Sequence, residues 1–269
     1  MECKNCKNQL PKNSDFCNEC GGKVIRNRLT FRNIFEHISE TFFNYDNKLL
    51  RTLVDLFKKP ETVIGGYIDG VRKRYVNPIS YFGLAITMSG LYLIIVSKFY
   101  PESMDFSILT APGQEEFQQK NMSFVQEYQS LFMMFYIPIY ALIARITFLG
   151  LKKFNYTELL VIFMFTQAQI SILSAFSTII LAMCGITHGV ISLVMLPLMI
   201  IYNAFVLKRL YELNIGSMIA RLLLFFVILG VCLFIGGIIA AIIMFINGDF
   251  QEIMEAQKAA KEVAVVIIN

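Results

Sequence analysis

Long apolar runs in the C-terminal two thirds of the chain limit its fold more than any other feature. Residues 1–77 are polar and mixed, whereas beyond them come runs long enough to cross a bilayer, each of which needs about 20 residues. Charged residues make up 16% of the chain, below the roughly 25% that is usual for a soluble domain. We therefore predict an all-α integral membrane protein with about five transmembrane helices.

The apolar runs give the expected positions of the spans. They are predicted at residues 78–99, 131–151, 159–183, 190–207 and 218–246. The stretch CGITHG, residues 184–189, is long enough only for a tight hairpin between the third and fourth spans. An odd number of spans places the two termini on opposite sides of the membrane.

Two pairs of cysteines stand at the N-terminus, in the pattern C-x2-C-x10-C-x2-C: Cys3, Cys6, Cys17 and Cys20. Each pair places two thiolates on one metal, and two pairs complete a tetrahedral site. We predict one structural Zn²⁺ in a small zinc ribbon, with two disulfides, a redox pair or an iron centre as alternatives. Thiolate ligation indicates a reducing compartment, and four ligands leave no open position for catalysis.

Apolar residues recur at helical spacing twice between the ribbon and the first span. The first face contains Phe31, Ile34, Phe35, Ile38 and Phe42, and the second contains Leu50, Leu53, Val54 and Phe57, before Pro60. Such faces, edged with Lys and Arg, are typical of helices that lie in the membrane interface. A helix packed on the spans or on another subunit is the alternative.

These features divide the chain into four predicted parts. They are a zinc ribbon over residues 1–26, amphipathic interfacial helices over 27–77, a five-span domain over 78–247 and an extracytoplasmic tail over 248–269.

Basic residues are concentrated on one side of the predicted membrane. Twenty of the 24 Lys and Arg residues lie in residues 1–77 or flank the loops after the second and fourth spans. The positive-inside rule then places the N-terminus in the cytoplasm and the C-terminus outside. Arg72, Lys73 and Arg74 would hold the cytoplasmic end of the first span against anionic lipid. Because orientation in the bilayer explains these charges, we expect no nucleic-acid partner.

A second set of N-terminal residues carries a resemblance. Beside the four cysteines, the matching residues are Arg51, Thr52, Pro60, Tyr67, Gly70, Arg72, Arg74, Tyr75 and Pro78. Over residues 1–80 the chain resembles a bacterial family of zinc-ribbon-headed multi-pass membrane proteins of unknown function, and beyond them only the span pattern is similar. The resemblance implies a protein of the bacterial inner (cytoplasmic) membrane, and it brings no activity with it.

Polar residues inside the spans are the remaining candidate sites. Arg145 is a charge within the second span, and we expect it to snorkel to the interface or to pair, with phosphate binding as the alternative. Within the third span, four polar residues recur at helical spacing and form a polar stripe: Gln167, Ser171, Ser174 and Thr178. This stripe predicts hydrogen bonds between helices or, alternatively, a wet groove for a polar lipid headgroup.

Small residues in the fifth span are spaced four apart. The pairs are Gly236 with Ala240 and Gly237 with Ala241. This spacing lets helix backbones approach closely, so it predicts packing within the chain or a homo-oligomer.

The sequence lacks the patterns of common enzymes. It contains no set of Ser, His and Asp at catalytic spacing, no Walker loop and no glycine-rich dinucleotide turn. We therefore expect a non-enzymatic membrane protein whose cytoplasmic zinc head binds an unidentified protein, as a scaffold, assembly factor or sensor. The alternative is a lipid or small-solute transporter that uses the polar groove beside the third span.

Overall fold

The computed structural model describes residues 1–22, 24, 26, 30, 48–105, 108, 121–122 and 124–247. The chain divides into two compact units, Met1–Lys48 and Leu49–Asn269, which are described separately below. The helix predicted over residues 31–42 and the tail over 248–269 lie outside the described residues.

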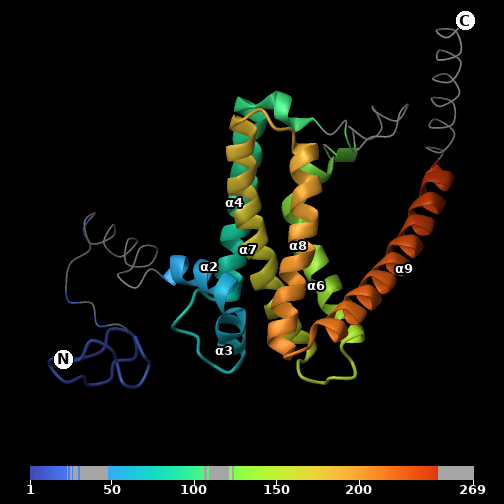
Figure 1. Cartoon of the computed structure of the whole chain (residues 1–269). Helices are drawn as coiled ribbons and strands as arrows, with labels where there is room; N and C mark the ends of the chain where they lie inside the picture. The colour runs from blue at the N-terminus through green and yellow to red at the C-terminus, as the bar shows by residue number, and fades with distance from the viewer. Residues whose placement is uncertain are drawn as a thin grey trace, which may run out of the picture. The chain divides into compact units, whose positions relative to one another are not determined.

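Helices make up the regular structure of the second unit (Figure 1). In chain order they are α2 (Lys48–Lys58), the π-helix η1 (Glu61–Gly65), α3 (Gly66–Ile68), α4 (Pro78–Phe99), the 3₁₀ helix η2 (Pro101–Met104), α6 (Gln129–Thr147), α7 (Tyr156–Met183), α8 (His188–Tyr211) and α9 (Ile215–Asn247). Five of them, namely α4, α6, α7, α8 and the Ile215–Ile239 part of α9, are long and apolar enough to cross a membrane. For the part of the chain that the structure describes, the predicted helical fold with five such helices is confirmed.

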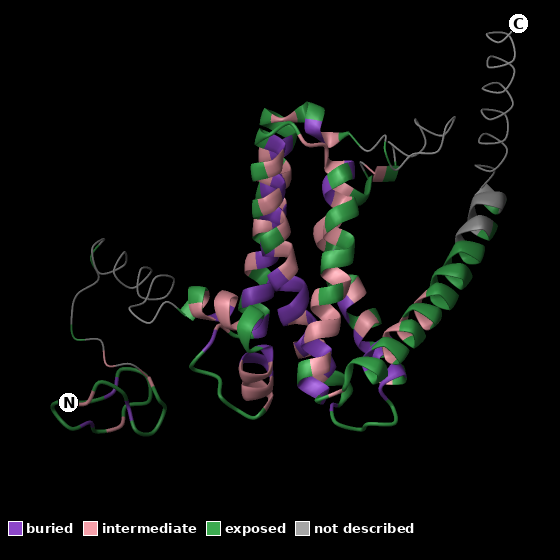
Figure 2. Ribbon diagram, in the orientation of Figure 1, coloured by how far each residue is buried: buried purple, intermediate pink, exposed green. Residues whose placement is uncertain are grey.

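Helix α7 is the centre of the bundle. It packs against α4, α6 and α8, and 56% of its most apolar 18-residue stretch is buried, the largest share among the five long helices. In α9 the same measure is 0%. This helix touches α6 and α8, and Met218 near its N-terminal end is buried. Figure 2 shows this contrast between the buried middle of the bundle and the exposed length of α9.

Specific residues begin and end the long helices. Asn77 accepts a hydrogen bond from the Ser80 amide at the start of α4, where Pro78 occupies the first turn. Asn155 and Glu158 form a reciprocal capping box at the start of α7. At its end, Gly185 has a φ of +77° and the Ile186 amide donates to the Leu181 carbonyl, which is a Schellman motif. The predicted tight hairpin between the third and fourth spans is therefore present.

The second long helix ends earlier than the apolar pattern indicated. It was expected to run to residue 151, but α6 ends at Thr147, the chain then forms turns, and Lys152 has a φ of +47°. The apolar character continues because Phe148 is buried in the turn, with its ring stacked on that of Tyr211 at a centroid distance of 4.4 Å. Packing of the loop on α8 produced the same pattern as a further helical turn.

The loops of the second unit gather at two ends of the bundle. The segment from α2 to α3, the α6–α7 loop and the α8–α9 loop lie at one end, whereas η2 and the α7–α8 hairpin lie at the other (Figure 1). Within this unit, the basic loops that were assigned to one side of the membrane thus share one end. That this end faces the cytoplasm stays a prediction.

Candidate functional site

The four N-terminal cysteines form a compact cluster in the first unit. All four Sγ atoms lie within 4.8 Å of one another, with 3.7 Å between Cys3 and Cys20 and 3.5 Å between Cys6 and Cys17. A tetrahedral ion with metal–sulfur bonds of about 2.3 Å requires sulfur separations of about 3.8 Å. A disulfide requires about 2.05 Å, and none of the six cysteines is in one. The cluster therefore has the geometry of a four-thiolate metal site.

The two C-x2-C segments fold in the same way. Cys3, Lys7 and Asn8 of the first segment correspond to Cys17, Gly21 and Gly22 of the second. The Lys7 amide donates to the Cys3 carbonyl and the Gly21 amide to the Cys17 carbonyl, both at 2.9 Å. The Cys3 amide donates to the Asn8 carbonyl and the Cys17 amide to the Gly22 carbonyl, both at 2.8 Å. Lys7 and Gly21 both adopt left-handed conformations, with φ of +64° and +68°. Two matching turns thus present two pairs of sulfur atoms to one point.

Nearby N–H groups favour thiolates in this cluster. The Asn5 side-chain amide and the Gly22 backbone amide lower the pKa of Cys20 to about 6. At Cys6 the Asn8 amide also lowers the pKa, but the neighbouring Cys20 and Cys17 sulfurs outweigh it and raise the pKa to about 12. Because negative sulfurs at this separation repel one another, full deprotonation of all four requires a cation between them.

The head has very little apolar core. Among its described residues, the buried cluster consists of Cys3, Leu10 and Cys17, with Val24 packed against it. A segment of this size without a larger core depends on a metal or on disulfides for its stability. Two of the three buried residues are themselves cluster cysteines, so the cysteine cluster and the core of the head coincide.

A second constellation lies in the other unit, where α2 is hydrogen-bonded both to the spans and to the segment after α3. We call it the interlock; it comprises Thr52, Leu53, Asp55, Leu56, Tyr75 and Val76 of the N-terminal segment with Tyr81, Gln169 and Tyr202 of the spans.

The interlock supplies donors to backbone carbonyls of α2. The Leu56 carbonyl would normally accept from residue 60, but Pro60 has no N–H. The Tyr202 hydroxyl of α8 donates to it instead, at 3.2 Å. From α7, the Gln169 Nε2 donates to the Leu53 carbonyl at 2.9 Å, and its Oε1 accepts from the Tyr81 hydroxyl of α4. Since Tyr81 and Gln169 are 0% and 1% exposed, this bridge between α2, α4 and α7 is buried.

Hydrogen bonds also join the two ends of this N-terminal segment to each other. The Thr52 Oγ1 accepts from the Val76 amide at 3.1 Å, and the Tyr75 hydroxyl donates to Asp55 at 2.8 Å. Burial and the Asp55 carboxylate raise the pKa of Tyr75. Gly70, with a φ of +100°, turns the chain between these contacts. Several residues that carried the resemblance thus meet in one local structure.

One comparison with known proteins matched the segment that contains α2 and the start of α4. The model of a family described as a protein of unknown function (DUF3667) matches residues 46–90, which span α2, η1, α3 and the first part of α4. No curated protein matches the chain, and no solved structure matches it. The chain is therefore similar, over this segment, to a family of unknown function, and the bacterial zinc-ribbon assignment stays a prediction.

The predicted anchoring residues are found on or near the basic end of the bundle. Arg72, Lys73 and Arg74 are exposed, and the guanidinium groups of Arg72 and Arg74 lie 5.7 and 5.4 Å from the ring centroids of Tyr67 and Tyr75. Arg145 is half-buried, and its Nη1 donates to the Phe154 carbonyl at 2.7 Å. Arg145 thus ties the α6–α7 loop to α6, whereas lipid or phosphate binding by these residues stays a prediction.

The predicted polar stripe of α7 faces its neighbouring helices. Gln167 and Thr178 are 2% and 1% exposed, and Ser171 and Ser174 are half-buried. The Gln167 Nε2 lies 3.5 Å from the Asn203 Oδ1 of α8, and the Ser171 hydroxyl lies 3.9 Å from the Met133 sulfur of α6. A hydrated groove along this stripe stays a prediction.

Gly236 and Gly237 face open space within the described part of the chain. A Cβ on Gly236 or Gly237 would meet no atom within 4 Å, and the side chains of Ala240 and Ala241 lie outside the description. Packing between two copies through these residues stays a prediction.

Proposed function

We propose that this chain is a non-enzymatic multi-pass membrane protein whose N-terminal head holds one structural Zn²⁺ and binds a protein partner. The observation that carries the proposal is the cluster of four sulfurs within 4.8 Å, built by two matching turns on a chain with five membrane-length helices. Four tetrahedral thiolates suit Zn²⁺, and a closed coordination shell supplies folding energy rather than catalysis.

The head offers a surface to a partner. Phe16 stands directly before Cys17 in the second turn, and its side chain is 61% exposed. An aromatic side chain held on a metal-folded turn is a typical anchor for protein recognition. We propose that a cytoplasmic protein contacts the head around Phe16, so that the protein acts as a scaffold, assembly factor or sensor.

The location follows from the charge distribution. The positive-inside rule, applied to the basic end of the bundle, favours a cytoplasmic head with the C-terminus outside. The bacterial inner membrane is what the resemblance over residues 1–80 implies. A reducing cytoplasm also keeps four thiols available for a metal. These two arguments rest on different residues and favour the same orientation. Transport beside α7 remains the alternative to the scaffold role.

Crosslinking from the head tests this function. A photoreactive phenylalanine at Phe16 in the full-length protein should crosslink a defined cytoplasmic protein in native membranes, identified by mass spectrometry. The crosslink should fall at least about tenfold in Cys17→Ser/Cys20→Ser, because the turn that presents residue 16 is then unfolded.

The same probe at Phe99, which is 66% exposed at the other end of α4, serves as the control and should give a different set of products. An unchanged product in the cysteine variant, or no protein product from Phe16, would contradict the proposal.

A further inference from the structure

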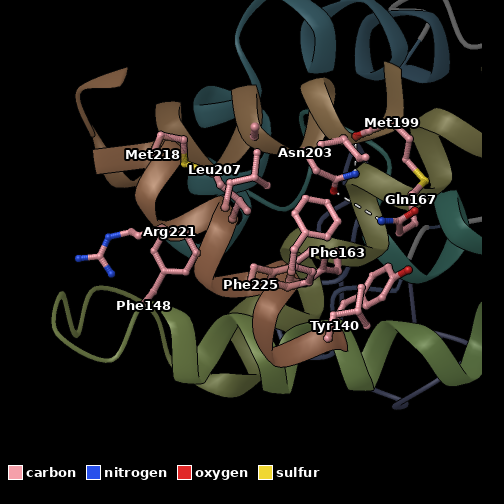
Figure 3. A pocket seen from close by; sticks show the side chains of 15 residues that line it. Tyr140, Phe148, Phe163, Gln167, Met199, Asn203, Leu207, Met218, Arg221 and Phe225 are labelled. Atoms are coloured by element: carbon pink, nitrogen blue, oxygen red, sulfur yellow. Dashed lines mark hydrogen bonds between the residues drawn. The ribbon is translucent and has the colours of Figure 1, made fainter. Parts of the chain in front are cut away.

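A hollow lies between α6, α7, α8 and α9. Its cavity volume is about 70 Å³. This is well below the roughly 300–1,000 Å³ of drug-sized sites, so the hollow suits a slender group rather than a compact ligand. Its lining is mostly apolar, with Phe163, Leu207 and Phe225 among its members, and it includes the polar Gln167, Asn203 and Arg221. We call this hollow the α8–α9 groove (Figure 3).

The α8–α9 groove is long and narrow in character. Its lining runs from Met199 to Leu207 on α8 and from Met218 to Leu229 on α9. At 1.5 Å per residue these stretches extend about 12 and 17 Å along their helices. Both helices are membrane-length and apolar, so this length lies inside the predicted bilayer region. An extended apolar chain fits such a groove better than a compact polar solute does.

The charged side chain of the lining lies at one end of the groove, away from the neutral Gln167 and Asn203 (Figure 3). Gln167 and Asn203 lie near Tyr140 and Met199, whereas Arg221 lies at the other end beside Phe148 (Figure 3). The Arg221 Nη1 donates to the Thr147 carbonyl at 2.8 Å, and its guanidinium lies 5.2 Å from the Phe148 ring centroid. Arginine has five N–H donors, and the head of this side chain points away from the groove interior in Figure 3. It therefore presents a fixed positive charge at the rim.

We propose that the α8–α9 groove binds part of one acyl chain of an anionic phospholipid, with the headgroup phosphate at Arg221. Apolar lining accounts for the chain, and the rim guanidinium accounts for the charge, because arginine pairs well with phosphate oxygens. Arg221 is at the basic end of the bundle, beside the loop that follows Lys208 and Arg209, where an anionic headgroup meets favourable charge.

This site is independent of the proposed zinc head, since it uses no residue of the first unit. Its test is photolabelling of the full-length protein in phosphatidylcholine vesicles. The vesicles contain a trace of either phosphatidylglycerol or phosphatidylcholine with a diazirine in the acyl chain, and labelled peptides are mapped by mass spectrometry. We expect the phosphatidylglycerol probe to label residues 199–207 and 218–229 more strongly than the exposed residues 231–235 of α9. In the groove residues, its labelling should exceed that by the phosphatidylcholine probe about fivefold.

Two alanine-to-phenylalanine variants, one in the groove on α8 and one on the exposed face of α9, separate the effect of filling the groove from the effect of adding a large side chain elsewhere. Ala204→Phe fills the groove and should abolish most of its labelling, whereas the same substitution at the exposed Ala220 of α9 should leave labelling unchanged. Gel filtration confirms that each variant is folded.

Arg221 is tested by its effect on lipid preference. Arg221→Gln should bring the two probes to equal labelling of the groove, and Arg221→Lys should retain the preference, because a purely structural loss would not change the ratio between probes. Labelling of the groove no stronger than that of residues 231–235, equal labelling by both probes in the unmodified protein, or unchanged groove labelling in Ala204→Phe would each overturn the proposal.

Discussion

Replacing Cys17 and Cys20 with serine is expected to remove the bound metal completely and to unfold the head while leaving the helical bundle intact. Two of the four sulfurs are lost, and the remaining buried core of the described head is Cys3 and Leu10, with Val24 packed against them. Structural zinc contributes roughly 10–16 kcal/mol of apparent binding free energy in small zinc domains, and that energy is the folding energy of the domain. We therefore expect metal content to fall from one ion per chain to none.

Two measurements on the purified full-length variant check this result. Elemental analysis should find no zinc, and limited proteolysis should cleave within residues 1–22 at least about tenfold faster than in the unmodified protein. Cys184→Ser/Cys232→Ser is the matched control, since these two cysteines are exposed and lie far along the chain in the other unit. Equal metal content in both double variants would contradict the assignment of the site.

Gln169→Leu is expected to destabilise the bundle and to release α2 from it. The change removes the donor to the Leu53 carbonyl and leaves the Tyr81 hydroxyl buried without its acceptor. Leaving a buried polar group unpaired costs about 1–3 kcal/mol. A loss of this size would lower the unfolding temperature in detergent by about 2–4 °C per kcal/mol. Trypsin should also cut sooner at Lys58, which ends α2.

Gln167→Leu provides the matched control on the same helix. Gln167 is equally buried, but its recorded hydrogen bond, to Asn203, is long at 3.5 Å, so we expect a smaller loss. The double variant Tyr81→Phe/Gln169→Leu removes both sides of one buried pair and should be more stable than the sum of the single changes predicts, by about 1 kcal/mol. Additive effects, or a larger loss in Gln167→Leu, would contradict the role of the interlock.

The number of membrane-length helices could be predicted because each depends only on its own length and composition. A run of 18 or more apolar residues has few alternatives to a transmembrane helix. Bounds were less certain where loop residues pack on the bundle. Phe148 and Leu151 extended the apolar run beyond Thr147, although the chain there forms turns against Tyr211.

The four-cysteine cluster could also be predicted, because its ligands are local in sequence. Each C-x2-C turn brings two sulfurs together by itself, so only one long-range step, the meeting of the two turns, had to be assumed. The equivalence of Lys7 and Gly21 was not expected, since Lys gives no sign of a left-handed conformation.

The interlock could not be predicted in the same way. Two of its hydrogen bonds join residues more than a hundred positions apart, namely Gln169 with the Leu53 carbonyl and Tyr202 with the Leu56 carbonyl. Gln169 is also outside the polar stripe that contains Gln167, so helical periodicity did not indicate that Gln169 bridges α2, α4 and α7. One signal was present: Pro60 stands four residues after Leu56 and leaves its carbonyl without a helical donor.

The most direct test of the central claim is zinc K-edge X-ray absorption on the full-length protein purified under reducing conditions. The account predicts one zinc per chain with four sulfur neighbours at about 2.3 Å and no nitrogen or oxygen neighbour. A protein without zinc whose N-terminal cysteines are joined in disulfides, or a zinc shell that contains nitrogen or oxygen ligands, would contradict it.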